Sequence, residues 1–249
     1  MQATIRRTAL VTGGMGGLGE ATARVLADAG HNVLVTHARD DASAQEWLKQ
    51  EAQAGYTFTP YEVDVADFDS CQRMAERIAA DGHVIDILVN NAGITRDATL
   101  RKMGKGKWDA VLRVNLDSMF NVTKPFIDGM VERGWGRIIN ISSVNGDKGQ
   151  FGQTNYSAAK AGIHGFTKAL AQEVARKGVT VNTVSPGYLA TRMVTSMPEA
   201  TVAQIVAGVP VGRLGQPEEI AALIGFIASD AAAYMTGSNV AMNGGQHMH

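Results

Sequence analysis

Three side chains between positions 143 and 160 have the types and the spacing that proton transfer to a carbonyl oxygen requires. Tyr156 and Lys160 are four residues apart in a segment with a helical pattern, and Ser143 follows a largely apolar run at 138–141. Because four residues make about one turn of an α-helix, the phenol and the ammonium share a face. A phenol titrates near ~10, so Tyr156 needs a nearby cation such as Lys160 to stabilise its anion at neutral pH. Ser143 can hydrogen-bond the oxygen that Tyr156 protonates, which predicts interconversion of a ketone and an alcohol. An ordinary solvent-facing helix is the alternative interpretation of the Tyr-x-x-x-Lys pattern alone.

A glycine-rich turn near the N-terminus predicts a dinucleotide site. The apolar run Thr8–Thr12 is typical of a buried parallel strand, and it leads through GGMGGLG into a helical pattern. Glycines let the backbone turn tightly and approach a pyrophosphate at the positive N-terminus of the following helix. Two registers fit this turn: G-x-G-x-x-G at 14, 16 and 19, and G-x-x-x-G-x-G at 13, 17 and 19.

The end of the second predicted strand, Asn32–Thr36, indicates which dinucleotide is bound. An Asp or Glu at this place would hydrogen-bond the 2′-hydroxyl of NAD and repel the 2′-phosphate of NADP. The chain continues instead with His37, Ala38 and Arg39, and the guanidinium of Arg39 could pair with a phosphate. We therefore predict NADPH/NADP as the cofactor. The alternative is that Arg39 is a solvated loop charge, and the two acids behind it either weaken the pairing or cap the next helix.

Taken together, these motifs resemble the short-chain dehydrogenase/reductase family over essentially the whole chain. The resemblance rests on Ser143, Tyr156 and Lys160, on the glycine turn, on the NNAG segment and on a P-G-x-x-x-T pattern near the sixth predicted strand. It implies a single dinucleotide-binding domain over 1–249, with a Rossmann-type doubly wound parallel sheet of about seven strands and helices on both faces. It also implies a homotetramer, and it favours the glycine register at 13, 17 and 19.

The same resemblance assigns roles beyond the Ser-Tyr-Lys set. Asn115 would complete the catalytic group by distorting its helix and holding a water connected to Lys160, and a satisfied buried Asn with no proton role is the alternative. Asp64 and Val65 would lie beside the adenine ring, or simply cap a helix, while Asn90 would mainly support the strand ends. The residues assigned to the NADP(H) site are Gly13, Gly17, Leu18, Gly19, Arg39, Asp64, Val65, Asn90, Ala92, Gly93, Tyr156, Lys160, Pro186, Gly187, Leu189 and Thr191.

Three further segments indicate the substrate. The loop VNGDKGQFGQTN at 144–155, the segment NAGITRD and the C-terminal MNGGQHM look most like acetoacetyl-CoA reductases of polyhydroxyalkanoate synthesis. This implies reduction of acetoacetyl-CoA to (R)-3-hydroxybutyryl-CoA, with residues 192–211 as a mobile flap over the substrate. The acyl pocket would be lined by Ser143, Gln150, Phe151, Gln153 and Tyr188.

Two other functions compete with this one. A 3-oxoacyl-(acyl carrier protein) reductase shares the catalytic residues but needs an outer basic patch for its acidic partner. Arg133, Arg137, Arg176 and Lys177 could supply that patch, or could be ordinary surface charges. A cofactor-binding regulator without catalysis is disfavoured because the set Asn115, Ser143, Tyr156 and Lys160 is complete.

The composition argues against other broad classes. With 249 residues, 45% of them hydrophobic, and a formal net charge of -1, the chain suits one large α/β domain and no nucleic-acid partner. No apolar segment reaches the roughly 18 residues of a membrane span, no signal peptide is predicted, and the scattered His residues give no metal-ligand spacing. The single Cys71 cannot form an internal disulfide, which fits a cytoplasmic location.

Hydrophobic periodicity predicts the remaining elements, with a kink at Pro125 in one long helix. The predicted strands are 8–12, 32–36, 58–63, 85–89, 138–141, 179–184 and 240–243, and the predicted helices are 41–54, 67–80, 108–133, the Tyr156 helix ending at 176, and 216–229.

Overall fold

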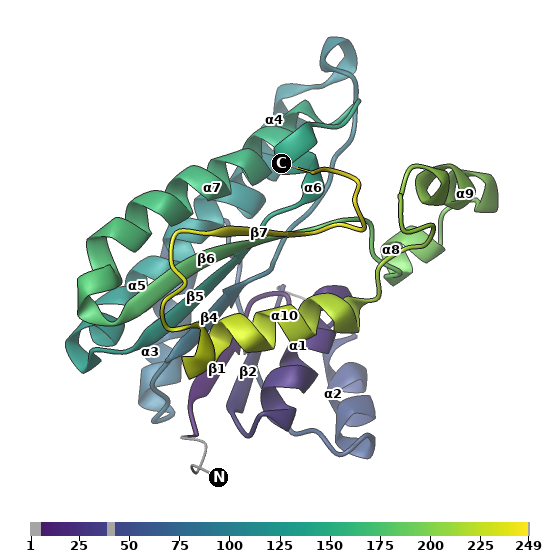
Figure 1. The fold of residues 1–249 in the computed structure, drawn as a ribbon. Coiled ribbons are helices and arrows are strands. Elements are labelled where there is room, and N and C mark those ends of the chain that lie inside the picture. Colours follow the sequence, from purple (N-terminus) through teal and green to yellow (C-terminus); the bar gives the residue numbers. More distant parts are fainter. Residues whose placement is uncertain (1–5, 39–42, 249) are drawn as a thin grey trace.

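The computed structural model describes residues 6–38 and 43–248, and its centre is one sheet of seven parallel strands (Figure 1). The strands are β1 (Thr8–Val11), β2 (Asn32–His37), β3 (Thr59–Glu62), β4 (Ile87–Asn90), β5 (Gly136–Ile141), β6 (Val179–Pro186) and β7 (Asn239–Met242). Their order in the sheet is β3-β2-β1-β4-β5-β6-β7, so the winding reverses between β1 and β4. The predicted doubly wound α/β fold is confirmed, and strand boundaries differ from the prediction by two residues at most.

Helices cover both faces of the sheet because its central strands are buried on both sides, as is typical of parallel strands. Ala9 and Val11 of β1 pack into one core and Leu10 into the other, as alternating side chains must. The first face carries α1 (Gly17–Asp28), α2 (Ala44–Gln53) and α10 (Pro217–Ala228), and the second carries α3 (Phe68–Ala80), α5 (Ser118–Arg133) and α7 (Thr154–Val174).

The long predicted helix over 108–133 is interrupted, but not at Pro125. It divides into α4 (Lys105–Leu112), a π-helical segment (Arg113–Asp117) and α5, which runs through Pro125. The interruption is centred on Asn115, whose side-chain amide donates to the carbonyl oxygen of Val111 at 2.9 Å. A side chain that inserts into the helical ladder distorts the helix there.

Two segments predicted without regular structure contain helices. The loop after Ser143 begins with α6 (Val144–Lys148), and the flap region contains α8 (Arg192–Thr195) and α9 (Glu199–Ala207). Figure 1 shows α8 and α9 projecting from the body beside the carboxyl edge of the sheet. The structure also contains short 3-10 turns at Leu100–Lys102, Ala175–Lys177 and Asp230–Ala232.

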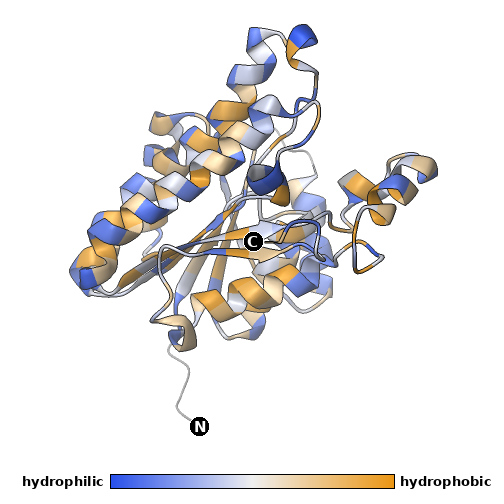
Figure 2. Cartoon of the chain, turned by 45° about the horizontal axis from the view of Figure 1, so that its top comes forward, coloured by the Kyte–Doolittle hydropathy of each residue, from blue (hydrophilic) through white to orange (hydrophobic). Residues whose placement is uncertain are grey.

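The hydropathy of the ribbon follows these layers, with apolar strands inside and mixed helices outside (Figure 2). None of the helices in the part of the chain that the structure describes is both long and apolar enough to cross a membrane.

Candidate active site

Two cavities open at the carboxyl edge of the sheet, where a doubly wound fold leaves a crevice at the reversal of strand order. The larger cavity, of about 740 Å³, lies at the ends of β2 and β3. The catalytic cavity, of about 290 Å³, is lined by Ser143, Tyr156 and Lys160. Gly93 and Ile94 line both cavities, so the two meet at the turn after β4. Together they form one crevice with room for an extended ligand.

The glycine turn after β1 supports the register at 13, 17 and 19. Gly13 and Gly17 adopt φ angles of +60° and +53°, in the left-handed region that favours glycine. A Cβ on Gly19 would lie 2.2 Å from the carbonyl oxygen of Gly13, so no side chain fits there. A Cβ on Gly16, by contrast, would meet nothing within 4 Å. Since α1 begins at Gly17, its positive N-terminus lies at this turn, next to Leu18 in the catalytic cavity.

Asn91, rather than Asn90, faces the crevice. The Asn91 side-chain amide donates to the carbonyl oxygens of Thr12 and Gly13 at 3.0 and 3.1 Å, and Asn91 lines the catalytic cavity. The Asn90 side chain is buried and donates to Thr123 and Asn140, so it joins β4 to α5 and β5. The Asn90 side chain thus supports the strand ends and lines neither cavity, and a contact of this residue with the cofactor stays a prediction.

The larger cavity is lined by residues that the family resemblance places around adenosine. Asp64 and Val65 line it together with Ala92 and the end of β2. Asp64 does not cap α3, because that cap is Asp67, whose carboxylate accepts a hydrogen bond from the Ser70 backbone at 2.6 Å. No carboxylate stands at Thr36, His37 or Ala38, the described end of β2. Arg39 lies outside the described residues.

The catalytic side chains converge from β5, α6 and α7. Ser143 is the N-cap of α6, and its Oγ accepts from the Asn145 backbone at 3.1 Å, which leaves its own proton to be donated. Tyr156 receives a hydrogen bond from Ser143. Lys160 is 3% exposed, and its Nζ lies 5.6 Å from the centre of the Tyr156 ring and donates to the Ile141 carbonyl at 2.7 Å. The predicted set of Ser143, Tyr156 and Lys160 is thus brought together.

Burial dominates the electrostatics of this site. It raises the pKa of Tyr156 to about 12, although the hydrogen bond from Ser143 acts in the opposite direction. It also lowers the pKa of Lys160 to about 8. Burial therefore outweighs the other influences on the phenol pKa here, and the role of Lys160 in lowering it stays a prediction. The phenol is neutral at physiological pH, as it is at its ordinary pKa near ~10, and the neutral form is the one that a proton donor needs.

Asn115 fixes the turn that joins the two cavities. Its amide donates to the Ile94 carbonyl at 2.9 Å, and its Oδ1 accepts from the Ile94 backbone at 3.2 Å. A Cβ on Gly93 would lie 2.6 Å from that Oδ1 and 3.6 Å from the Lys160 Nζ. Asn115 therefore holds Gly93 and Ile94 close against Lys160, and only glycine allows this approach.

Of the predicted acyl-pocket residues, Gln150 and Phe151 lie outside the catalytic cavity. Gln153 and Tyr188 line the catalytic cavity, and the Gln153 amide donates to Asp97 at 2.9 Å. Phe151 is 87% exposed and Gln150 accepts from Lys148 at 3.1 Å, and neither lines the cavity. The loop between α6 and α7 turns outward at these residues, so the prediction of an aromatic acyl limit at Phe151 is not met in this chain.

Comparison with known proteins identifies the family. The family model described as short chain dehydrogenase matches residues 7–201, most of the sheet and the whole catalytic set. The chain belongs to the short-chain dehydrogenase family. Its relatives include the acetoacetyl-CoA reductase of Cupriavidus necator, 54% identical over 243 residues (98% of this chain and 99% of the relative), and that of Allochromatium vinosum, 54% identical over 244 residues (98% and 99%). A 3-oxoacyl-[acyl-carrier-protein] reductase of Pseudomonas aeruginosa is 44% identical over 243 residues (97% and 98%).

The P-G-x-x-x-T turn of this short-chain dehydrogenase forms one wall of the catalytic cavity. Pro186, Gly187, Leu189 and Thr191 all line it, and a Cβ on Gly17 would lie 3.3 Å from Thr191 Cγ2. The predicted cofactor residues from both halves of the chain therefore meet across the crevice.

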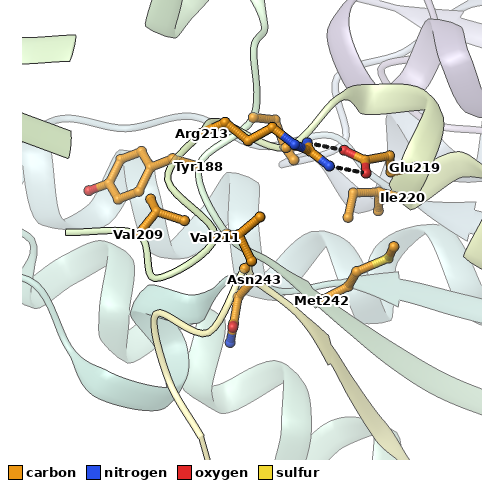
Figure 3. Close-up of a pocket in the computed structure, with 12 residues that line it drawn as sticks. Tyr188, Val209, Val211, Arg213, Glu219, Ile220, Met242 and Asn243 are labelled. Atoms are coloured by element: carbon orange, nitrogen blue, oxygen red, sulfur yellow. Dashed lines mark hydrogen bonds and ion pairs between the residues drawn. The ribbon is translucent and has the colours of Figure 1, made fainter. Parts of the chain in front are cut away.

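A further cavity, of about 200 Å³, backs this turn (Figure 3). It is lined by Tyr188 and by Val209 and Val211, which lie at the end of the flap region. Arg213 donates two hydrogen bonds of 2.7 Å to the carboxylate of Glu219, drawn as dashed lines in Figure 3. This ion pair anchors the end of the flap region to the N-terminus of α10.

Several residues of this short-chain dehydrogenase's catalytic cavity were missed from sequence. Thr95 and Asp97 lie in the ITRD segment directly after NNAG, so their position behind a recognised motif could have indicated them. Asn145 could have been indicated in the same way, because it follows the catalytic serine by two residues. No motif indicated Val194 and Met197, because they line the cavity only where the flap region passes beside it. The missed lining residues are Asn91, Ile94, Thr95, Asp97, Ile141, Ser142, Val144, Asn145, Val194 and Met197.

Proposed function

We propose that this short-chain dehydrogenase reduces acetoacetyl-CoA to (R)-3-hydroxybutyryl-CoA with NADPH. The observation that carries the proposal is 54% identity, over nearly the full length of both chains, to acetoacetyl-CoA reductases. The catalytic side chains that such a reduction needs lie in one cavity next to a glycine turn that excludes side chains. Because the tight glycine turn leads into α1 at Gly17 beside the crevice, the crevice fits a dinucleotide whose pyrophosphate approaches the N-terminus of α1.

Each catalytic residue has one task. Bound NADPH supplies a hydride to the ketone carbon. Tyr156, whose phenol is neutral at physiological pH, donates its proton to the carbonyl oxygen. Ser143 donates a hydrogen bond to the same oxygen, since its own acceptor position is filled by the Asn145 backbone. Lys160 would hold the nicotinamide ribose and stabilise the phenolate that proton transfer leaves, and Asn115 would position the water that returns a proton.

NADPH is favoured over NADH by the residues at the end of β2, although Glu62, Asp64 and Asp67 line the larger cavity beside Arg73 and Arg77. The described end of β2 has no carboxylate that would repel a 2′-phosphate. Arg39, outside the described residues, follows directly in the chain, and in this proposal its guanidinium pairs with the 2′-phosphate.

The alternative carrier-protein reductase activity has less support. Of the four basic residues considered for docking, Arg137 is 3% exposed in its side chain and contacts Asp230 at 3.4 Å. Arg133 donates to the Ile85 carbonyl at 2.7 Å and lies 3.5 Å from Asp86. Only Arg176 and Lys177 are exposed without a described acidic partner, which is a small patch for an acidic protein.

We propose that the chain is a single-domain cytoplasmic enzyme of polyhydroxybutyrate synthesis and that it forms a homotetramer. Two exposed apolar surfaces suit such an assembly. Edge strand β7 and helix α10 expose Met242 and Phe226 on one side of the molecule. On α3 and α5, Phe68 and Phe120 stack at 5.8 Å between ring centres and are both exposed. Two separate exposed patches are what an assembly with two kinds of interface requires.

The deciding experiment compares kcat/KM for acetoacetyl-CoA and for acetoacetyl-carrier protein, each with NADPH and with NADH. The proposal expects acetoacetyl-CoA with NADPH to be the best pair. A clear preference for the carrier-protein substrate would assign the chain to fatty-acid synthesis instead, and no turnover of either would leave it a binding protein.

A further inference from the structure

A buried polar cluster lies behind the catalytic helix, and nothing in the mechanism above uses it. Its members come from α6, α7, β6 and β7 and from the residue that follows β5. We call them the His164 cluster: Ser142, Asp147, His164, Ser185 and Asn239. The His164 and Asp147 side chains are 16% and 5% exposed. Of the five residues only Ser142 also lines the catalytic cavity.

The hydrogen-bond inventory fixes one proton of His164. The hydroxyl of Ser142 has a single proton, which it donates to the Lys160 carbonyl oxygen at 2.8 Å. Toward the His164 Nε2, at 2.9 Å, the Ser142 Oγ can therefore only accept. The same holds for Ser185, which donates to Asn239 Oδ1 at 2.8 Å and lies 3.4 Å from the His164 Nε2. The His164 Nε2 must carry a proton.

The second ring nitrogen faces a carboxylate. His164 Nδ1 lies 3.6 Å from Asp147 Oδ1. A neutral ring with its proton on Nε2 would direct a lone pair at that carboxylate, whereas a protonated Nδ1 makes the contact attractive. The charge on Asp147 also needs compensation, because its Oδ1 accepts from Asn239 at 3.1 Å but its Oδ2 is buried with no hydrogen-bond partner.

We propose that a buried His164 imidazolium paired with the Asp147 carboxylate positions Ser143 against Tyr156 for catalysis. This proposal rests on the proposed function only for its kinetic test. Asp147 lies one turn after Ser143 in α6, and His164 lies one turn after Lys160 in α7. The pair therefore ties the helix that begins at the catalytic serine to the helix that carries the catalytic tyrosine and lysine.

The packing between these helices leaves little freedom. A Cβ on Gly146 would lie 2.9 Å from the carbonyl carbon of Lys160, so α6 rests directly on the backbone of α7. Ser142, bonded to both His164 and the Lys160 carbonyl, precedes Ser143 in the chain. A displacement of about 1 Å between reacting groups can lower a rate by about 10²-fold. Loss of the pair should thus change kcat more than cofactor affinity.

The first test reads the charge of His164 directly. The ring nitrogens of His164 in the full-length protein, ¹⁵N-labelled on histidine and free of substrate, are observed by NMR at pH 7.5 and assigned with His164→Gln. The proposal expects both nitrogens to be protonated in the wild type, and only one in Asp147→Asn. A neutral His164 in the wild type would overturn the proposal whatever the enzyme's substrate.

The second test is kinetic and includes a rescue. Asp147→Asn and His164→Gln are each expected to lower kcat about 10- to 100-fold, while the dissociation constant for NADPH changes less than about twofold. The double variant, a neutral pair that retains donors, should recover part of the lost kcat of Asp147→Asn. Asp128→Asn, which removes an exposed ion pair with Lys124, is the matched control and should be unchanged.

Either of two kinetic results would contradict the positioning role: kcat of Asp147→Asn within about twofold of wild type, or parallel loss of kcat and NADPH affinity with no recovery in the double variant. If acetoacetyl-CoA is not the substrate, the proposed function fails, and the same variants are compared on whichever 3-oxoacyl thioester the wild type reduces.

Discussion

Replacing Lys160 by Met should make the protein more stable and inactive. Lys160 is fully buried, and burial lowers its pKa from 10.5 to about 8. A group whose pKa falls on folding binds a proton more weakly in the folded state, so its protonated form opposes folding. At pH 7 the unfolded chain and the folded chain both hold this proton, and the folded state bears the full cost. With one pKa unit worth about 1.4 kcal/mol, that cost is about 3 kcal/mol.

The cost should decrease as the pH rises, which gives the prediction its signature. Between the folded pKa of about 8 and the unfolded value of 10.5, the unfolded state binds more protons, so wild-type stability increases with pH relative to the variant. At pH 9.5 the remaining cost is about 1 kcal/mol. Met has a similar length but loses the hydrogen bond to the Ile141 carbonyl, worth about 1 kcal/mol. Lys160→Met should therefore be about 2 kcal/mol more stable than wild type at pH 7 and nearly equal at pH 9.5.

Urea unfolding of the cofactor-free protein, at one protein concentration and at pH 7, 8, 9 and 9.5, measures this difference. The comparison with wild type at each pH cancels the titration of all other groups. A Lys160→Met protein that is less stable than wild type at pH 7, or a difference that does not change between pH 7 and 9.5, would refute the reasoning. It would show that the backbone hydrogen bond compensates the buried charge.

Three further predictions concern the reaction. Tyr156→Phe should lower kcat by about 10²-fold or more while leaving the NADPH dissociation constant nearly unchanged, because only the proton donor is lost. Stopped-flow kinetics measure kcat and fluorescence titration measures the dissociation constant. A near-normal kcat would show that Tyr156 is not the proton donor. Phe151→Ala should leave the dependence of kcat/KM on acyl-chain length unchanged, because Phe151 is 87% exposed. Tyr188→Ala should alter that dependence, because Tyr188 lies in the cavity wall. The opposite pattern would place the acyl chain at the outer loop. Arg39→Ala should reduce the preference for NADPH over NADH by roughly 10- to 150-fold, which is the contribution of a charged hydrogen bond to phosphate. An unchanged ratio of the kcat/KM values for NADPH and NADH would show that Arg39 does not determine the cofactor preference.

Local spacing determined the features whose cause is local. Tyr156 and Lys160 share a helical face because they are four residues apart, and the glycine turn has its shape because residues 13 and 17 adopt positive φ. The alternation of apolar side chains within short strands, separated by helical patterns, determined the parallel sheet. These parts of the fold and of the catalytic set were predictable from the sequence.

Neighbours distant in the chain decided the rest. Asn90 and Asn91 are adjacent and identical in type, and only the packing of β4 against β5 and α5 decides which side chain faces the crevice. The family resemblance implied a distorted helix at Asn115, but only the fold brings its side chain to Ile94, 21 residues away. His164 is a lone histidine in an apolar helical pattern, and its partners Asp147 and Ser142 approach it only when α6 packs on α7.

The protonation behaviour of the active site belongs to the tertiary structure as well. The spacing of Tyr156 and Lys160 predicted a lowered phenol pKa, but the folded protein raises it to about 12. Sequence spacing sets which charges are neighbours, whereas the cost of removing each from water depends on every element that covers them. For this chain the sequence determined which groups meet in the catalytic cavity, and only burial by the assembled sheet and helices decided in which direction the pKa of each is shifted.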